Sequence, residues 1–174
     1  EPLRYAGRIV KKIGSYTSGK TENNKLISDN KLPSPSSPLL DEFYTISALQ
    51  RTLEEEEEFS FNVKFSIVVP LYNTPLDFLE EMIESVQNQT YKNWELCMAD
   101  GSDVNHSQVG EKVQELALKD KRIKYKKLEQ NLGISENTNA CIAMATGAYI
   151  GLFDHDDLLH PSAIYEVMQQ ICKN

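Results

Sequence analysis

The chain has 174 residues, of which 18 are Lys or Arg and 26 are Asp or Glu, giving a formal net charge of −8 at neutral pH. This length corresponds to about one domain of ~150 residues with a short remainder, and a hydrophobic fraction of 40% suffices for one core. An acidic chain repels phosphate backbones, so nucleic acid is not expected as a partner, and no apolar run approaches the ~20 residues of a membrane span.

Residues 1–62 are expected to form a linker and a helical segment rather than a domain. Residues 31–38 read KLPSPSSP, a composition typical of extended or disordered linkers. The basic, mildly amphipathic stretch 8–13 either touches an anionic surface at the inner face of the membrane or is the solvated remnant of a helix. The chain begins at Glu1 rather than Met, so we expect it to be a piece of a longer protein.

Residues 41–58 carry a helical pattern. Apolar side chains recur at spacings of three, three and four residues, which predicts one stripe of an amphipathic helix: Phe43, Ile46, Leu49 and Leu53. The run of five glutamates at 54–58 is expected to be a solvated face or a fraying helix end, with no role in a site.

A sharp change of composition at Val63 marks the start of the expected domain, residues 63–174. Residues 65–69 form a nearly continuous apolar run ended by Pro70, which predicts a strand buried on both faces of a parallel sheet. Thr74 reads as the N-cap of the helix that follows. The apolar stripe of that helix is Leu76, Leu79, Ile83 and Val86.

Strands and helices then alternate to the end of the chain. The further strands expected are residues 94–99, 123–125 and 149–153, and the further helices are 109–117, 135–145 and a last one opened by Pro161. Lysines alternate with apolar residues around 123–125, which is typical of a half-exposed edge strand. The alternation predicts an α/β fold with a mainly parallel sheet of about four strands.

Three cysteines are expected to be buried, reduced thiols of a cytoplasmic protein, because no two of them have the spacing of a metal knuckle. They are Cys97, Cys141 and Cys172.

Ligands of parallel α/β sheets bind beyond the carboxyl ends of the strands, so the residues that follow each strand are the informative ones. The polar segments at these places are residues 70–74, 100–103, 131–133 and 154–157. Turn chemistry alone favours Asn, Asp and Gly there, so any one of these segments could be an ordinary turn.

The last of these segments concentrates three carboxylates, Asp154, Asp156 and Asp157, around His155. Two carboxylates about 4 Å apart repel by on the order of 4 kcal/mol at an effective dielectric near 20, so either a proton or a cation is taken up. Hard oxygen ligands select Mg²⁺ or Mn²⁺, and Mg²⁺ uses one or two carboxylates together with phosphate oxygens and waters. We therefore expect metal-dependent diphosphate binding. The alternative is an acidic helix start ahead of Pro161, favoured by the helix dipole.

Two residues after the earlier strands could contact a nucleoside. The Asp100 carboxylate can accept hydrogen bonds from a ribose hydroxyl or a base N–H. Tyr72 either stacks on a base or packs as an edge aromatic. The sequence has no glycine-rich phosphate loop of the dinucleotide or Walker type, which argues against a dinucleotide oxidoreductase and a P-loop ATPase.

Three stretches, in this order and spacing, resemble family 2 glycosyltransferases of the GT-A fold: FSIVVPLYNTP, SVQNQTYKNWELCMADGSD and NLGISENTNACIAMATGAYIGLFDHDD. The resemblance runs from about residue 64 to residue 170 and implies a Rossmann-like GT-A half-domain. The YNT, NTNA and DHDD variants are most similar to those of bacterial rhamnosyltransferase-like enzymes that build surface polysaccharides.

The resemblance also implies a role for each matching position. Pro70, Tyr72 and Asn73 would frame the nucleotide base, and Asp100 would hold the base or the ribose. Two departures leave the donor open: many relatives carry a second Asp where this chain has Gly101, and Arg where it has Thr138.

The remaining implied positions surround the donor phosphates. Asp154 and Asp156 form the DXD pair of the family, with Asp157 adjacent, and would bind the ribose and the metal-bound diphosphate. The pocket near the phosphates would be shaped by Asn131, Gly133 and Asn139.

The sequence thus predicts the donor-binding half of an inverting glycosyltransferase that takes a UDP- or dTDP-sugar. The acceptor would be a saccharide or lipid-linked saccharide in surface polysaccharide synthesis, and the general base, an Asp or Glu, is expected beyond residue 174. The half-domain is therefore expected to be inactive alone, and apolar surface left bare would favour a homodimer. The alternatives are a non-catalytic nucleotide-binding or scaffold module and a metal-dependent phosphohydrolase.

Overall fold

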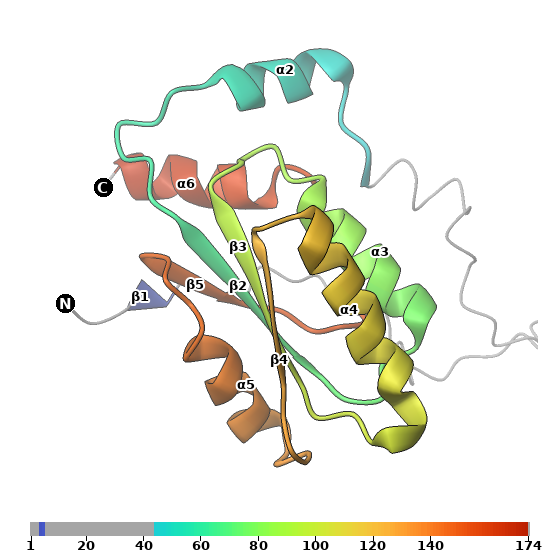
Figure 1. Cartoon of the computed structure of the whole chain (residues 1–174). Coiled ribbons are helices and arrows are strands. Elements are labelled where there is room, and N and C mark those ends of the chain that lie inside the picture. Colours follow the sequence, from blue (N-terminus) through green and yellow to red (C-terminus); the bar gives the residue numbers. More distant parts are fainter. Residues whose placement is uncertain (1–3, 6–43, 174) are drawn as a thin grey trace, which may run out of the picture.

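The computed structural model describes residues 4–5 and 44–173, so the linker at 31–38 and the basic stretch at 8–13 lie outside the described residues. Its centre is an all-parallel sheet with the strand order β1-β5-β2-β3-β4 (Figure 1). The strands are β1 (Arg4–Tyr5), β2 (Phe65–Leu71), β3 (Trp94–Asp100), β4 (Ile123–Lys127) and β5 (Tyr149–Leu152). The four predicted strands are confirmed, and the two-residue β1 adds a fifth that the sequence did not indicate.

The longest pairing in the sheet joins β2 to β3, in register from Phe65 opposite Trp94 to Leu71 opposite Asp100. Every residue of β3 is buried, as expected for a central strand covered on both faces. β4 is the edge strand that the alternating lysines predicted, and its last two residues are exposed.

Helices cover both faces of the sheet (Figure 1). One face carries α3 (Leu76–Gln87), α4 (Ser107–Lys119) and α6 (Ala163–Lys173), whose apolar side chains pack with β2 and β3 into the main core. The opposite face carries α5 (Ile134–Ile142), which covers a smaller cluster around Val68, Cys97 and Cys141. The remaining helical elements are α2 (Ala48–Glu56) and the short 3₁₀ helix η1 (Val104–His106).

Two of the three cysteines match the expectation of buried thiols. Cys97 and Cys141 are buried and free, whereas Cys172 is half-buried. Burial raises the pKa of the Cys97 thiol to about 12 and that of Cys141 to about 11, so both stay protonated at neutral pH.

Helix α2 differs from its prediction in length and in the face that it buries. Residues 41–43 of the predicted helix, Phe43 among them, lie outside the described residues. Helix α2 begins at Ala48, with the Ser47 hydroxyl accepting a hydrogen bond from the Gln50 amide as its N-cap. Leu49 and Leu53, expected on the apolar stripe, are 70% and 61% exposed. Glu54 is buried instead, so the first residue of the acidic run is not solvated.

The reason is a set of hydrogen bonds that attaches α2 to the domain. The Glu54 carboxylate accepts from Gln50 Nε2 at 2.8 Å, from Thr90 Oγ1 at 2.8 Å and from Ser162 Oγ at 2.9 Å. These donors satisfy a carboxylate that would be costly to bury unpaired. Figure 1 shows α2 lying beside α6, in agreement with these contacts.

The predicted N-cap at Thr74 is not formed. Helix α3 begins at Leu76, its cap residue is Pro75, and no side chain caps it. The Thr74 hydroxyl is buried without a hydrogen-bond partner among the described residues. No helix within the described part of the chain is long and apolar enough to cross a membrane.

Candidate donor-binding site

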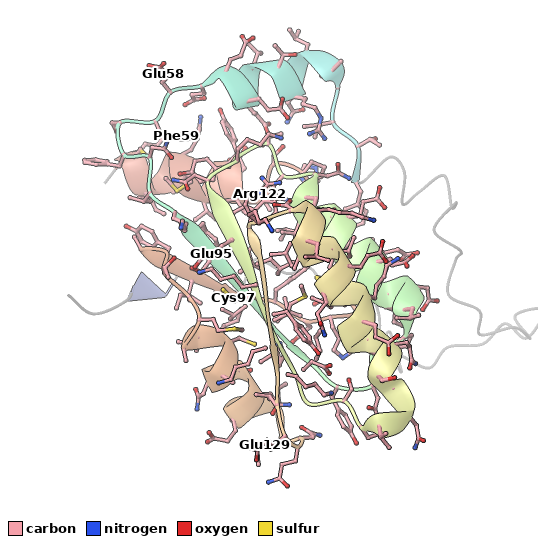
Figure 2. All side chains as sticks on the ribbon, in the orientation of Figure 1. Glu58, Phe59, Glu95, Cys97, Arg122 and Glu129 are labelled. Atoms are coloured by element: carbon pink, nitrogen blue, oxygen red, sulfur yellow. The ribbon has the colours of Figure 1, made fainter. Side chains whose placement is uncertain are left out.

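The four polar segments predicted after the strands lie at one edge of the sheet, because β5, β2, β3 and β4 are parallel neighbours. Figure 2 marks this edge by Glu129, just beyond β4, and shows Glu95 nearer the opposite end of β3. The sheet order therefore brings together the residues that the sequence placed in one site.

The segments after β2 and β3 are joined by three hydrogen bonds. The Asn73 side chain donates to Asp103 Oδ2 at 2.9 Å, and the Asp103 amide donates to Asn73 Oδ1 at 3.0 Å. The Asn73 backbone amide also donates to Ser102 Oγ at 2.8 Å. Asn73 has a φ of 48°, a left-handed conformation that Asn tolerates better than most residues. We call these contacts the loop clasp.

Asp100 lies at the end of β3 and is fully buried. Its Oδ1 accepts a hydrogen bond from the Ser102 amide at 2.8 Å, and its Oδ2 accepts from the Tyr125 hydroxyl at 2.8 Å and from Lys127 Nζ at 3.1 Å. Burial alone would raise the pKa of Asp100, but these hydrogen bonds outweigh it and keep the pKa below its usual value. Both oxygens of the predicted base-contacting carboxylate thus have partners within the chain.

A glycine makes room for the tyrosine that contacts Asp100. A Cβ at Gly110, on α4, would lie 2.2 Å from the Tyr125 hydroxyl. Burial and the nearby Asp100 charge raise the pKa of Tyr125, so the phenol remains a donor to the carboxylate. The sequence offered no signal for this contact, because the three residues lie on different elements.

The segment after β4 is held by an asparagine that the sequence analysis did not single out. The Asn137 side chain is buried and donates to Asn131 Oδ1 at 2.8 Å. Asn131 Oδ1 also accepts from the Gly133 amide at 3.0 Å. Gly133 has a φ of 88°, which favours glycine, and it precedes α5 as its cap residue. Asn139 is exposed on α5.

Gly101 lies directly beside this segment. A Cβ on Gly101 would meet Asn137 Nδ2 at 3.0 Å and the Asn131 Cα at 3.1 Å. The segments after β3 and β4 therefore approach too closely for a larger side chain at position 101 without a shift. This close approach explains why glycine suits position 101, where many members of the family that the sequence resembles carry aspartate.

The acidic segment 154–157 follows β5 next to β2. The Phe153 amide donates to the Val68 carbonyl at 3.1 Å, which carries the β5–β2 pairing to the start of the segment. Asp156 is exposed, and Asp154 and His155 are half-buried. The Nδ1 atom of His155 has no hydrogen-bond partner among the described residues.

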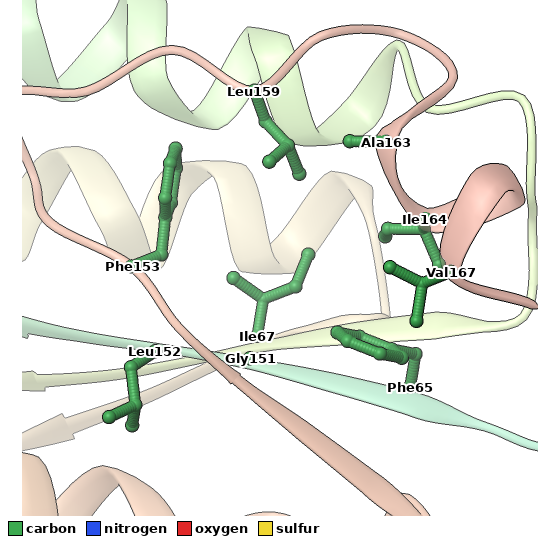
Figure 3. A pocket seen from close by; sticks show the side chains of 9 residues that line it. All are labelled: Phe65, Ile67, Gly151, Leu152, Phe153, Leu159, Ala163, Ile164 and Val167. Atoms are coloured by element: carbon green, nitrogen blue, oxygen red, sulfur yellow. The ribbon is translucent and has the colours of Figure 1, made fainter. Parts of the chain in front are cut away.

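Two buried apolar residues, Phe153 and Leu159, fix the ends of the acidic segment. Both line a small pocket that is partly open to solvent, between β2, β5 and α6 (Figure 3). Its lining side chains are all apolar, so this pocket offers no side chain that would bind a phosphate or a cation. The acidic segment itself lies outside that lining.

The aspartates fit a metal bound jointly with a ligand better than a metal bound by protein alone. Within residues 44–173, no three His, Cys, Asp or Glu side chains are grouped so that they could hold a metal ion. Burial, and to a smaller extent the charge of Asp157, raise the pKa of Tyr44. One or two carboxylates, completed by phosphate oxygens and waters, form a usual Mg²⁺ donor set.

Two further predicted residues, Pro70 and Tyr72, lie within and directly after β2. Tyr72 is 46% exposed, which leaves its ring accessible at the site edge, and Pro70 is half-buried within β2. The strand order places most of the predicted residues at or just beyond the carboxyl edge of the sheet: Pro70, Tyr72, Asn73, Asp100, Asn131, Gly133, Asp154, Asp156 and Asp157. Asn139 lies within α5 instead, and the assignment of these residues to one donor site stays a prediction.

Comparison with known proteins identifies related sequences over the described domain. The family model described as Glycosyl transferase family 2 matches residues 66–174. An uncharacterized protein of Sinorhizobium fredii is 46% identical over 106 residues, which are 61% of this chain and 12% of that protein. A GalNAc(5)-diNAcBac-PP-undecaprenol beta-1,3-glucosyltransferase of Campylobacter jejuni is 36% identical over 109 residues, 62% of this chain and 34% of that enzyme.

A solved structure extends the comparison to three dimensions. S. aureus TarS residues 1–349, in complex with UDP-GlcNAc, superposes with a TM-score of 0.54 and 25% sequence identity, over 63% of this chain and 31% of that one. The chain thus spans about a third or less of the length of the relatives that it matches.

Proposed function

We propose that this chain, which belongs to glycosyl transferase family 2, forms the part of a larger enzyme that binds the nucleotide-sugar donor. The observation that carries the proposal is the convergence of four polar segments at the carboxyl edge of one parallel sheet. The solved relative that binds UDP-GlcNAc supports a UDP-sugar as the donor class, with a dTDP-sugar as the alternative.

The two ends of the donor would occupy different segments. The exposed ring of Tyr72 and the loop clasp would frame the base. Asp154 and Asp156, which follow the neighbouring strand β5, would face the diphosphate. Asn131 and Gly133 would border the phosphates, since their segment lies against Gly101. Because its carboxylate is buried, Asp100 would act indirectly, by holding the segment 100–103 in place.

A divalent cation fits the acidic segment as a partner of the diphosphate. Asp154 and Asp156 would hold Mg²⁺ or Mn²⁺, with the remaining ligands from phosphate oxygens and water. When bound, such a cation neutralises charge on a departing nucleoside diphosphate. A mannosyltransferase from Pyrobaculum calidifontis solved with GDP-Man and Mn²⁺ shares the fold at a TM-score of 0.53 and 16% identity.

The transfer reaction is proposed for the whole protein. A base would take the proton of an acceptor hydroxyl, whose oxygen would attack the anomeric carbon of the sugar and expel the nucleoside diphosphate with inversion. We propose a saccharide or lipid-linked saccharide acceptor in surface polysaccharide synthesis. The Campylobacter relative, whose name includes a lipid-linked saccharide, supports this class.

Calorimetry on the 174-residue chain tests donor binding. UDP, dTDP, GDP and inorganic pyrophosphate are titrated with Mn²⁺ and again in EDTA. We expect metal-dependent binding of one nucleoside diphosphate, weakened about tenfold or more in Asp156→Asn. Asp77→Asn is the matched control, because Asp77 is an exposed aspartate on α3.

Equal affinity in Mn²⁺ and EDTA would contradict the metal assignment. Absence of nucleoside diphosphate binding, together with hydrolysis of a generic phosphomonoester, would favour the phosphohydrolase. An intact protein that binds the donor but transfers no sugar would favour the scaffold module.

A further inference from the structure

We propose that Lys127 is a positioning residue for the nucleoside end of the donor site, an inference that rests on the proposed function. Its ammonium group joins the Asp100 carboxylate to the Ser102 carbonyl and so fixes the segment beside the base. Lys127 belongs to the edge strand β4, and no motif of the sequence points to it.

The contacts of Lys127 differ from those of an ordinary surface lysine. Lys127 Nζ lies 3.1 Å from Asp100 Oδ2 and donates to the Ser102 carbonyl oxygen at 2.6 Å. Asp100 is fully buried, and a buried carboxylate requires a paired charge and hydrogen bonds. Lys127 supplies the only ammonium group paired with Asp100 among the described residues.

The effect of this ammonium group extends to the segment after β2. Ser102 is bonded through three groups: its amide to Asp100, its carbonyl to Lys127, and its hydroxyl to the Asn73 amide. Asn73 keeps a φ of 48°, which is costly without such support. Lys127 therefore stabilises, through Ser102, the backbone that presents Tyr72.

The arrangement also predicts which ligand should bind less tightly when this support is lost. The segments fixed by Lys127 follow β2 and β3, whereas the proposed diphosphate ligands Asp154 and Asp156 follow β5. Loss of the ammonium group should therefore weaken binding of a nucleoside diphosphate and spare inorganic pyrophosphate.

The test uses the full chain with Mn²⁺ and the nucleoside diphosphate, among UDP, dTDP and GDP, that it binds most tightly. Lys127→Met should weaken that ligand about tenfold and change pyrophosphate affinity less than about twofold. Lys127→Arg keeps the charge and the donors, so it should restore affinity to within about threefold of wild type.

Lys126→Met is the matched control. Lys126 is exposed on the same strand, and its side chain has no hydrogen bond or ion pair within residues 44–173, so its removal should leave both affinities unchanged. Lys127→Gln is measured alongside, with the same direction expected, in case the Met variant does not fold.

Unchanged nucleoside diphosphate binding in the Lys127 variants overturns the inference, as does an equal loss of pyrophosphate binding or a failure of Arg to rescue. A wild-type chain that binds no nucleoside diphosphate overturns the proposed function itself. The two failures are therefore distinguishable by the wild-type titration.

Discussion

The Lys124 ammonium group lies 2.9 Å from a carboxylate oxygen of Glu95, and this ion pair completes a network around a buried acid near the start of β3. Glu95 also accepts hydrogen bonds from Ser66 Oγ at 2.7 Å and from the amide and hydroxyl of Thr146. Burial alone would raise the pKa of Glu95, but the hydrogen bonds from Lys124, Thr146 and Ser66 lower it to about 2.

We expect Glu95→Gln to lower the free energy of unfolding at pH 7 by about 2–3 kcal/mol, because it removes the charge that these donors stabilise. Urea denaturation measures the change. Glu129→Gln, an exposed glutamate just beyond β4, should stay within about 0.5 kcal/mol of wild type. Equal stability of the two variants would show that the network adds nothing to the fold.

The pH dependence of this difference follows from the direction of the pKa shift. The folded-state pKa, about 2, lies below the ordinary value of 4.5, so folding favours the ionised form. The stabilisation is fully present above pH 4.5 and is lost as the pH falls towards 2. The gap between wild type and Glu95→Gln should therefore narrow over that range, and a gap that widens would contradict the assignment.

Attachment of α2 should depend on one glutamate of the acidic run. Glu54→Ala removes the acceptor of the Ser162 hydroxyl and the nearer acceptor of the Thr90 hydroxyl, which keeps only the Pro161 carbonyl at 3.3 Å. We expect a loss of about 1–3 kcal/mol in the free energy of unfolding. Glu56→Ala, exposed on the same helix, is the control and should change stability by less than about 0.5 kcal/mol. Similar losses in both variants would point to the charge of the run rather than to these contacts.

Gly110 should resist replacement although it lies inside a helix. Alanine normally stabilises a helix by about 1 kcal/mol over glycine, but its Cβ would lie 2.2 Å from the Tyr125 hydroxyl. We expect Gly110→Ala to lower the free energy of unfolding by about 1–3 kcal/mol. The same change in a Tyr125→Phe background should cost less, and a double-mutant cycle with no coupling would refute the contact.

Asp100 should affect both stability and nucleoside recognition. Asp100→Asn removes the charge paired with Lys127 and should lower the free energy of unfolding by about 2–4 kcal/mol. In calorimetry with Mn²⁺ below the unfolding temperature, binding of a nucleoside diphosphate should weaken more than binding of pyrophosphate. Equal weakening of both ligands would contradict a role at the nucleoside end.

The repeated strand-helix pattern was sufficient to predict the sheet. Continuous apolar runs identified β2 and β5, because a strand buried on both faces is apolar along its length. The alternating lysines of β4 identified an edge strand, because a half-exposed strand alternates polar and apolar residues. The carboxyl-edge location of the candidate site followed from the same pattern.

Contacts between elements were not predictable in this way. The Gly110–Tyr125–Asp100 arrangement and the burial of Glu54 depend on residues far apart in the sequence, which leave no local periodicity. A local pattern can also mislead. The sequence around Thr74 resembles a helix N-cap, but the Thr74 hydroxyl makes no capping hydrogen bond.

The lysines of β4 have a consequence for association between molecules. An uncovered outer strand invites pairing with another chain, and charged side chains oppose it. Lys124 and Lys127 form ion pairs with the buried carboxylates of Glu95 and Asp100. The same two lysines place positive charge on the outer strand, which opposes the addition of a strand from another molecule. Loss of either positive charge would therefore remove an internal ion pair and a charge at the outer strand at the same time.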